Sequence, residues 1–117
     1  FYAHYDGQPV NQPGWLDPPF TPTLRGPPPA SPRIDLAPGA AINPDWRLHG
    51  RAIADDKSTI AVTLWALDAL AAKGLKPAVN IKILWEGEEE AGSPNFGTIV
   101  RDNAALLAAD LLVMGDG

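Results

Sequence analysis

The stretch "ILWEGEEEAGS", residues 83–93, joins an apolar run to a dense acidic turn. The apolar run belongs to "AVNIKILWEG", residues 78–87, whose composition favours a buried β-strand. Four carboxylates follow within five positions, at Glu86, Glu88, Glu89 and Glu90, and they repel one another. A solvated turn tolerates this repulsion, and so does a site that holds multivalent cations, whereas burial without cations is costly. The rest of the sequence is needed to decide between a solvated turn and a cation site.

The segments around this strand alternate between helical and extended patterns. Residues 57–73, "KSTIAVTLWALDALAAK", place apolar side chains at the spacing of a helix face, and Gly74 follows as a C-cap. A second helix is expected over about 96–108, and the apolar runs at 1–6 and 110–117 predict further strands. This order predicts an α/β fold in which helices flank a mostly parallel sheet.

Proline dominates the segment between the first predicted strand and the first predicted helix. The chain has 13 Pro residues, and most of them lie in the first 46 positions. Because Pro fixes φ and donates no backbone hydrogen bond, residues 11–46 are predicted to form a long loop without a regular helix or a central strand. Long loops in compact domains are commonly functional or disordered.

The composition restricts the possible partners. The net charge is −5 and the pI is near 4.7, which argues against nucleic acid or a membrane as partner, since both need basic patches or long apolar spans. The absence of Cys excludes disulfides and thiolate metal sites. The chain begins and ends within apolar runs, so we expect a piece of a larger protein, truncated at both ends. The sequence leaves its compartment open between cytoplasmic, secreted and periplasmic.

Side chains that can bind metal lie where three predicted strands end. Ligands of parallel sheets bind beyond the carboxyl ends of the strands. His4 and Asp6 end the first strand, the acidic turn ends the second, and Asp116 follows the third. The adjacent Asp55 and Asp56 stand just before the first long helix. If these groups share a site, they should converge.

Each group also has an ordinary explanation. The His-x-Asp pair can arise by chance at a strand end, an Asp before a helix can be its N-cap, and Asp116 between two glycines can be a turn residue. His49, in "RLHGR", is better explained as a structural residue or a substrate contact than as a ligand, because it has no orienting carboxylate two residues away.

Taken together, the groups favour a cation site. Carboxylates with one imidazole suit Zn²⁺, Mn²⁺ or Co²⁺. A set this rich in carboxylates can hold two ions about 3.5–4 Å apart, an arrangement that activates a bridging water.

Five pieces, "AHYDGQPV", "W-L-DPPFTP", "GRAIADDKS", "LWEGEEEAGS" and "MGD", occur in an order and at spacings that resemble the M20 family of metallopeptidases. This family contains di-zinc dipeptidases, carboxypeptidases and deacylases. The resemblance implies that residues 1–117 are part of a zinc-peptidase-like catalytic domain. Two positions depart from the family pattern: Ala52 and Ser58 stand where the family usually has Gly. The insert between Arg25 and Trp46 is also longer than expected.

The resemblance assigns metal ligands by position. His4 and Asp116 would ligate the first metal, Asp55 would bridge both metals, and Glu90 would ligate the second. The family typically has a cis peptide at the position of Asp55–Asp56. The cofactor implied is two Zn²⁺ ions in the complete enzyme, with Mn²⁺ or Co²⁺ as other candidates.

The resemblance also assigns catalytic roles. Glu89 would be the general base that takes a proton from the bridging water, and Asp6 would orient the ring of His4. Glu86 would support the site through hydrogen bonds, and Glu88 would be solvated.

The expected activity is hydrolysis of a peptide amide bond, in a dipeptide or at a C-terminus. A last His ligand and a lid domain, which commonly forms a homodimer, would lie beyond this chain, so we expect residues 1–117 alone to be inactive. Two alternatives remain open: an N-acyl amino acid deacylase on the same scaffold, and a non-catalytic acidic module that binds a cation or a protein.

Overall fold

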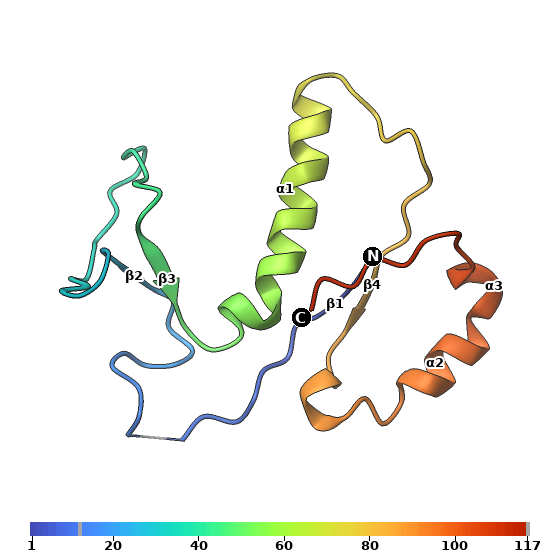
Figure 1. Ribbon diagram of the computed structural model, residues 1–117, viewed down its shortest axis with the longest axis horizontal. Coiled ribbons are helices and arrows are strands. Elements are labelled where there is room, and N and C mark those ends of the chain that lie inside the picture. The colour runs from blue at the N-terminus through green and yellow to red at the C-terminus, as the bar shows by residue number, and fades with distance from the viewer. Residues whose placement is uncertain (12, 117) are drawn as a thin grey trace.

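The computed structural model describes residues 1–11 and 13–116 (Figure 1). Strands and helices follow one another in the order β1 (Tyr2–His4), β2 (Thr23–Arg25), β3 (Arg47–His49), the π-helical turn η1 (Ile53–Lys57), α1 (Ser58–Ala72), β4 (Leu84–Glu86), the 3₁₀ turn η2 (Glu89–Ala91), α2 (Phe96–Asp102) and α3 (Ala104–Leu107). The mixture of helices with a parallel strand pair confirms the predicted α/β class.

The parallel pair consists of β1 and β4. His4 lies opposite Glu86 in this register, and Tyr2 lies opposite Leu84. Tyr2 also forms a parallel bridge with Met114, so β1 has a partner on both edges. The backbone N–H of Tyr2 donates to the carbonyl of Val113 at 2.9 Å. The strands are shorter than predicted: β4 occupies only the end of residues 78–87, and residues 110–116 contribute one bridge, while residue 117 lies outside the described residues.

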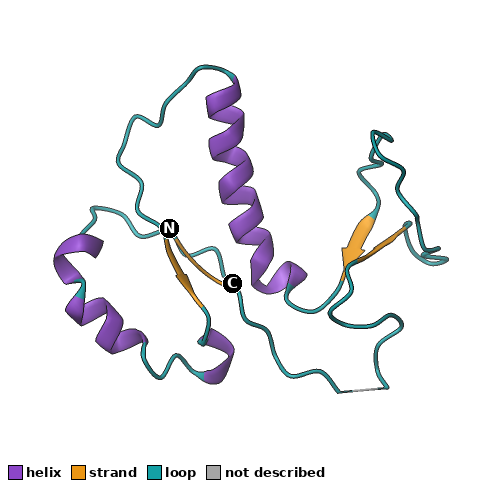
Figure 2. Ribbon diagram, turned by 180° about the vertical axis from the view of Figure 1, so that it is seen from behind, coloured by secondary structure: helices purple, strands orange, loops and turns teal. Residues whose placement is uncertain are grey.

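The helices match the predicted pattern closely. Helix α1 begins one residue later and ends one residue earlier than predicted, and Gly74 at φ 67° follows it as expected for a C-cap. The second predicted helix is divided into α2 and α3 at Asn103. In Figures 1 and 2, α1 lies on one side of the β1–β4 pair and the two shorter helices lie on the other. An edge-to-face contact of 5.4 Å between the rings of Tyr2 and Phe96 joins α2 to β1.

The proline-rich segment contains a strand that the sequence did not predict. Residues 23–25 are free of Pro and pair antiparallel with β3, which adds a short edge strand to a segment predicted to lack a regular helix or a central strand. Both strands of a two-stranded ribbon are edge strands, and an edge strand can form next to Pro residues. Arg25 fixes the ribbon by donating to both carboxylate oxygens of Asp17, at 2.8 and 3.0 Å.

Burial is concentrated around β1. Among the described residues, the buried apolar side chains are Tyr2, Ala3 and Ala52. Many large apolar side chains elsewhere are exposed, including Trp65 at 67%. The radius of gyration is 17.6 Å, whereas a compact domain of this length has about 13 Å. Within the described part of the chain, none of the helices has the length and apolar character needed to cross a membrane.

Candidate metal centre

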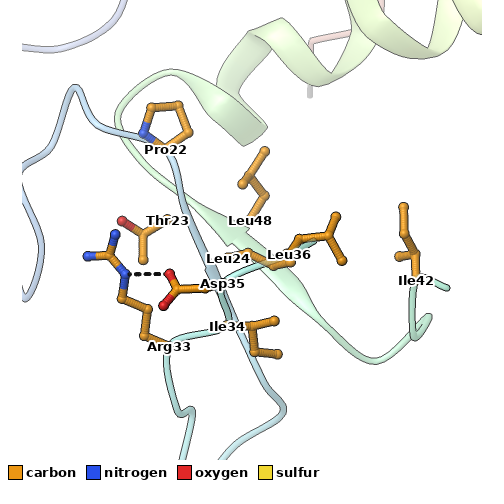
Figure 3. Close-up of a pocket in the computed structure, with 9 residues that line it drawn as sticks. All are labelled: Pro22, Thr23, Leu24, Arg33, Ile34, Asp35, Leu36, Ile42 and Leu48. Carbon is orange, nitrogen blue, oxygen red and sulfur yellow. Dashed lines mark ion pairs between the residues drawn. The ribbon is translucent and has the colours of Figure 1, made fainter. Parts of the chain in front are cut away.

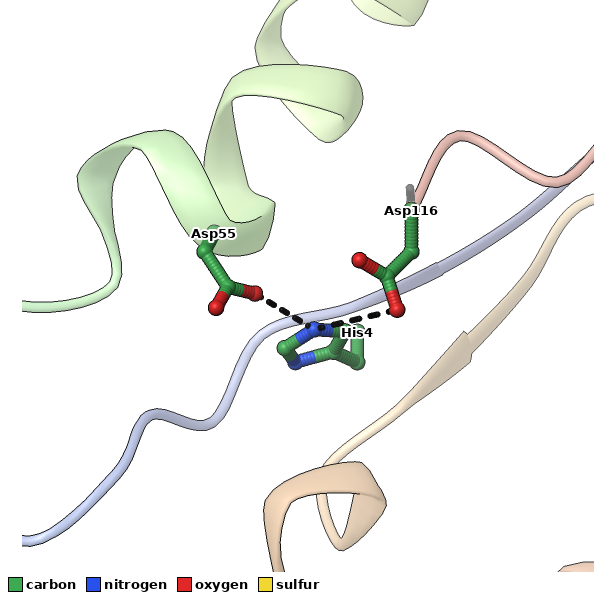
Figure 4. Close-up of side chains that lie close together, drawn as sticks. All are labelled: His4, Asp55 and Asp116. Atoms are coloured by element: carbon green, nitrogen blue, oxygen red, sulfur yellow. Dashed lines mark ion pairs between the residues drawn. The ribbon is translucent and has the colours of Figure 1, made fainter.

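His4 lies where three remote segments meet. Its side chain is 1% exposed, and its Nε2 atom lies 2.9 Å from Oδ1 of Asp55 and 3.9 Å from Oδ2 of Asp116 (Figure 4). Ligand atoms of these three residues all lie within 4.8 Å of one another. Oε2 of Glu89 lies 3.8 Å from the same ring nitrogen. The predicted convergence of strand ends and helix start is therefore present in the structure.

The turn before α1 explains how Asp55 reaches His4. Asp55 has φ −109° and ψ 100°, so the chain leaves helical geometry at this residue. The Asp55–Asp56 peptide is cis, as the family resemblance implied. Asp56 points inward, is 2% exposed and accepts the backbone N–H of His4 at 3.3 Å. Neither Asp caps a helix through its side chain, so the simple capping explanation does not describe this pair.

Asp6 joins the His4 ring to the acidic turn. Its Oδ1 lies 3.2 Å from Nδ1 of His4, and its Oδ2 accepts the backbone N–H of Glu90 at 3.0 Å. Since an ionised carboxylate only accepts, the proton of this bond sits on Nδ1 of His4. When His4 is neutral, its Nε2 atom then presents a lone pair to the surrounding carboxylates.

This arrangement fits a cation. Nε2 of His4 is buried and has no hydrogen-bond partner among the described residues, although Asp55 approaches it closely. Lone pairs of a nitrogen and several carboxylate oxygens face one another, which is unfavourable unless a proton or a cation lies between them. One imidazole with carboxylates is a donor set for Zn²⁺, Mn²⁺ or Co²⁺.

The electrostatics of the centre follow from this crowding. Burial lowers the pKa of His4, but the hydrogen bond with Asp6 and the charges of Asp55 and Glu89 outweigh it, so the net pKa is raised. The pKa of Glu89 is also raised, chiefly by desolvation, with the charges of neighbouring carboxylates adding to the shift and His4 opposing it. Glu89 is therefore a better proton acceptor than an ordinary surface glutamate.

The remaining glutamates of the acidic turn have separate partners. Glu90 is held by Gln8, whose backbone N–H donates to Oε1 at 3.0 Å and whose side-chain amide donates to Oε2. It is not in the group of ligand atoms around His4. Glu86 is buried and accepts the hydroxyl of Tyr2 at 2.7 Å, in keeping with its expected supporting role. Burial of the phenol, with a further contribution from this bond, raises the pKa of Tyr2.

Glu88 differs from expectation. Both its carboxylate oxygens accept the amide of Asn95, at 3.1 and 2.8 Å, so it is bonded within its own loop as well as exposed to solvent. Sequence reasoning did not identify Gln8, Asp56 or Asn95 as partners of the site residues. The position of Gln8 two residues after Asp6, on the same side of an extended chain, was the only available signal.

His49 lies apart from the centre, on the exposed strand β3. With Trp15 and Arg25 it lines a hollow of about 480 Å³. A second hollow, of about 440 Å³, lies on the ribbon, where Leu24, Ile34 and Leu48 form much of its wall (Figure 3). His49 is outside the group of His4, Asp55 and Asp116, and its role as a structural residue or a substrate contact stays a prediction.

Comparisons with known proteins agree with the geometry. The model of peptidase family M20/M25/M40 matches residues 1–115. The chain is 29% identical over 118 residues to a cysteinylglycine-S-conjugate dipeptidase of Corynebacterium striatum, covering 99% of this chain and 22% of that protein. It is 30% identical over 102 residues to a Beta-Ala-His dipeptidase of Rattus norvegicus, covering 86% of this chain and 17% of that protein.

A Cys-Gly metallodipeptidase of Schizosaccharomyces pombe is 29% identical over 104 residues, which is 88% of this chain and 18% of that protein. The chain thus spans about a fifth of the length of the curated relatives it matches. No solved structure matches the chain significantly. The match of the family model over nearly the whole chain shows that this protein belongs to peptidase family M20/M25/M40.

Proposed function

We propose that this chain supplies the metal centre of a peptidase that hydrolyses small peptides, most simply dipeptides. The observation that carries the proposal is the buried Nε2 atom of His4, which has no hydrogen-bond partner in the described chain and faces Asp55, Glu89 and Asp116. A non-catalytic acidic module would not need a buried imidazole at the centre of its carboxylates.

The proposed ligands follow from position and donor type. His4, Asp55 and Asp116 hold a first divalent cation, with Zn²⁺ as the first choice and Mn²⁺ or Co²⁺ as others. Asp55 and Glu90 contribute to a second ion. When bound, such ions lower the pKa of a coordinated water and polarise a carbonyl oxygen.

The chain's own residues then handle the proton and the geometry. Glu89 accepts the proton of the attacking water and passes it to the leaving amine, a role supported by its raised pKa and by its 3.8 Å distance from Nε2 of His4. Asp6 holds the His4 ring in one tautomer and one orientation through Nδ1.

The names of the relatives support dipeptides as the substrate class. The three relatives described above are all dipeptidases by name. N-acyl amino acids are the other class that this chemistry can hydrolyse, and a panel of both classes on the full-length protein decides between them.

We also propose that residues 1–117 are one part of a larger catalytic domain. The large exposed apolar side chains on α1, such as Val62, Leu64 and Trp65, support this proposal because an isolated helix gains little from them. A substrate lid, a further metal ligand and a homodimer contact would then come from other parts of the protein. The chain by itself is expected to be inactive, which an assay of the purified 117-residue chain against dipeptides would test.

The test of the proposed function is the pair Glu89→Gln and Glu88→Gln in the full-length protein. Removing the proton acceptor should lower peptide hydrolysis by about 10²–10⁴-fold while leaving the metal content unchanged. Glu88 belongs to the same turn but is bonded to Asn95, so its variant should keep activity within a few-fold. Near-normal turnover by Glu89→Gln would show that the role assigned to Glu89 is wrong.

A further inference from the structure

The first turn of α1 touches the segment that carries Asp116. The hydroxyl of Thr59 donates to the carbonyl of Gly115 at 3.1 Å. On its other side, Gly115 donates its N–H to the carbonyl of Tyr2 in β1, at 3.2 Å. The residue directly before Asp116 is therefore held from both the helix and the strand.

This contact is close enough to require glycine at position 115. A Cβ atom built on Gly115 would lie 2.7 Å from Oγ1 and 2.8 Å from Cβ of Thr59, and closer still to its methyl group. Distances this short do not occur between real side chains, so any larger residue would push the helix and the segment apart. The contact between Thr59 and Gly115 is thus a tightly packed one that leaves no room for a side chain at position 115.

Thr59 and Asp55 belong to one continuous piece of chain. The turn η1 runs directly into α1, and the hydroxyl of Ser58 ties the two together by donating to the carbonyl of Ala54 at 2.6 Å. The same piece therefore places Asp55 at one side of the His4 ring and, through Thr59, fixes the segment that brings Asp116 to the other side.

We propose that Thr59 is a positioning residue for the metal centre, which sets the distance between Asp55 and Asp116 by holding the carbonyl of Gly115. The inference rests on the proposed function, since it concerns the affinity of the same His4, Asp55 and Asp116 group for a divalent cation. Thr59 does not touch the cation itself. Partners that orient metal ligands typically change metal affinity by about 10–100-fold when they are removed.

The experiment compares Thr59→Val, Thr59→Ser and Thr63→Val in the full-length, metal-free protein. Co²⁺ is titrated, and its visible absorption spectrum and dissociation constant are measured. Valine keeps the shape of threonine but removes the donor, so Thr59→Val should bind the first Co²⁺ about ten-fold more weakly and with a changed spectrum. Thr59→Ser keeps the hydroxyl and should match the original protein. Thr63→Val makes the same change one turn along α1, where it should have no effect.

The outcomes separate this inference from the proposed function. Failure of the unsubstituted protein to bind Co²⁺ would overturn both. If the unsubstituted protein binds Co²⁺ and Thr59→Val binds it with the same dissociation constant and spectrum, the positioning role alone is overturned. This holds even if the melting temperature of the variant falls. An equal loss in Thr63→Val would also overturn it. If Thr59→Val does not fold, Gly115→Ala carries the test: it should weaken Co²⁺ binding, and unchanged affinity in that variant overturns the inference.

Discussion

The strands β1 and β3 have equal lengths but opposite surroundings. All three residues of β1 are buried, whereas all three residues of β3 are exposed. The contacts of β1 join residues far apart in sequence, such as Tyr2 and Glu86, which are 84 positions apart. The ribbon of β2 and β3 is held by a local ion pair between Asp17 and Arg25, which are 8 positions apart.

The difference in charge is more instructive than the difference in burial. In the ribbon, the carboxylate of Asp17 and the guanidinium of Arg25 satisfy each other, and the pKa of Asp17 is lowered accordingly. Around His4, the carboxylates of Asp55 and Asp116 face a single imidazole. Asp17 and Arg25 neutralise each other within the ribbon, whereas the carboxylates around His4 have no Lys or Arg partner among the described ion pairs.

The largest expected effect comes from His4→Ala, with His49→Ala as the control. Removing the imidazole takes away the nitrogen ligand itself, so divalent-metal affinity of the full-length protein should fall by more than about 100-fold, beyond the loss typical of an orienting partner. His49 lies on the exposed strand β3, so its variant should bind metal normally. Metal content after dialysis and calorimetric titration measure both. Equal losses of metal affinity in the two variants would show that His4 is no more important for metal binding than His49.

A smaller effect is expected from Gln8→Ala, compared with Asn95→Ala. Both amides hold a glutamate of the same acidic turn, but Gln8 holds Glu90 and Asn95 holds Glu88. If Glu90 is a ligand of the second ion, Gln8→Ala should weaken binding of that ion by about ten-fold. Asn95→Ala should leave both ions unaffected. Stepwise Zn²⁺ titration of the full-length protein distinguishes the two ions, and a loss confined to the first ion would count against this assignment.

The smallest effect on the metal centre is expected from Asp17→Asn. This change weakens the bonds to Arg25, so the amides of Gly26 and Ile34, which bond to neighbouring loop carbonyls, should exchange faster with solvent. Metal affinity should not change.

A pH series provides the matching control for that prediction. Because the folded-state pKa of Asp17 is lowered, the stabilisation from its ion pair is present above the ordinary Asp pKa of about 3.9 and is lost as the pH falls through the lowered value. Amide exchange of the original protein should therefore approach that of Asp17→Asn only in strong acid. Coupled loss of metal binding in Asp17→Asn at neutral pH would show that the two regions are not independent.

Local patterns in the sequence predicted the helices and the approach of Asp6 to His4. The apolar spacing of residues 57–73 matches α1 because helical periodicity is a property of the segment itself. The spacing of His4 and Asp6 likewise predicted that both side chains lie on one face, and their ring-to-carboxylate contact follows from it.

Other features depend on partners that no local pattern reveals. The lengths of β1 and β4 depend on which remote backbone groups pair, so the apolar run at residues 78–87 overstated the strand. Glu89 and Glu90 are neighbours with the same chemistry, and only the tertiary arrangement directs one to His4 and the other to Gln8. The contact between Thr59 and Gly115 has the same origin, because it joins residues 56 positions apart.

The paired edges of β1 also determine when the metal centre can assemble in a cell. Tyr2 and Glu86 are 84 positions apart, and ribosomes add about 5–20 residues per second, so β1 is synthesised several seconds before its first partner. Asp116 emerges later still, after the Val113 carbonyl that pairs with Tyr2. Until then the nascent chain holds His4 without its full set of carboxylates. A cation held by His4, Asp55 and Asp116, as proposed above, would therefore bind only after this whole segment has been translated.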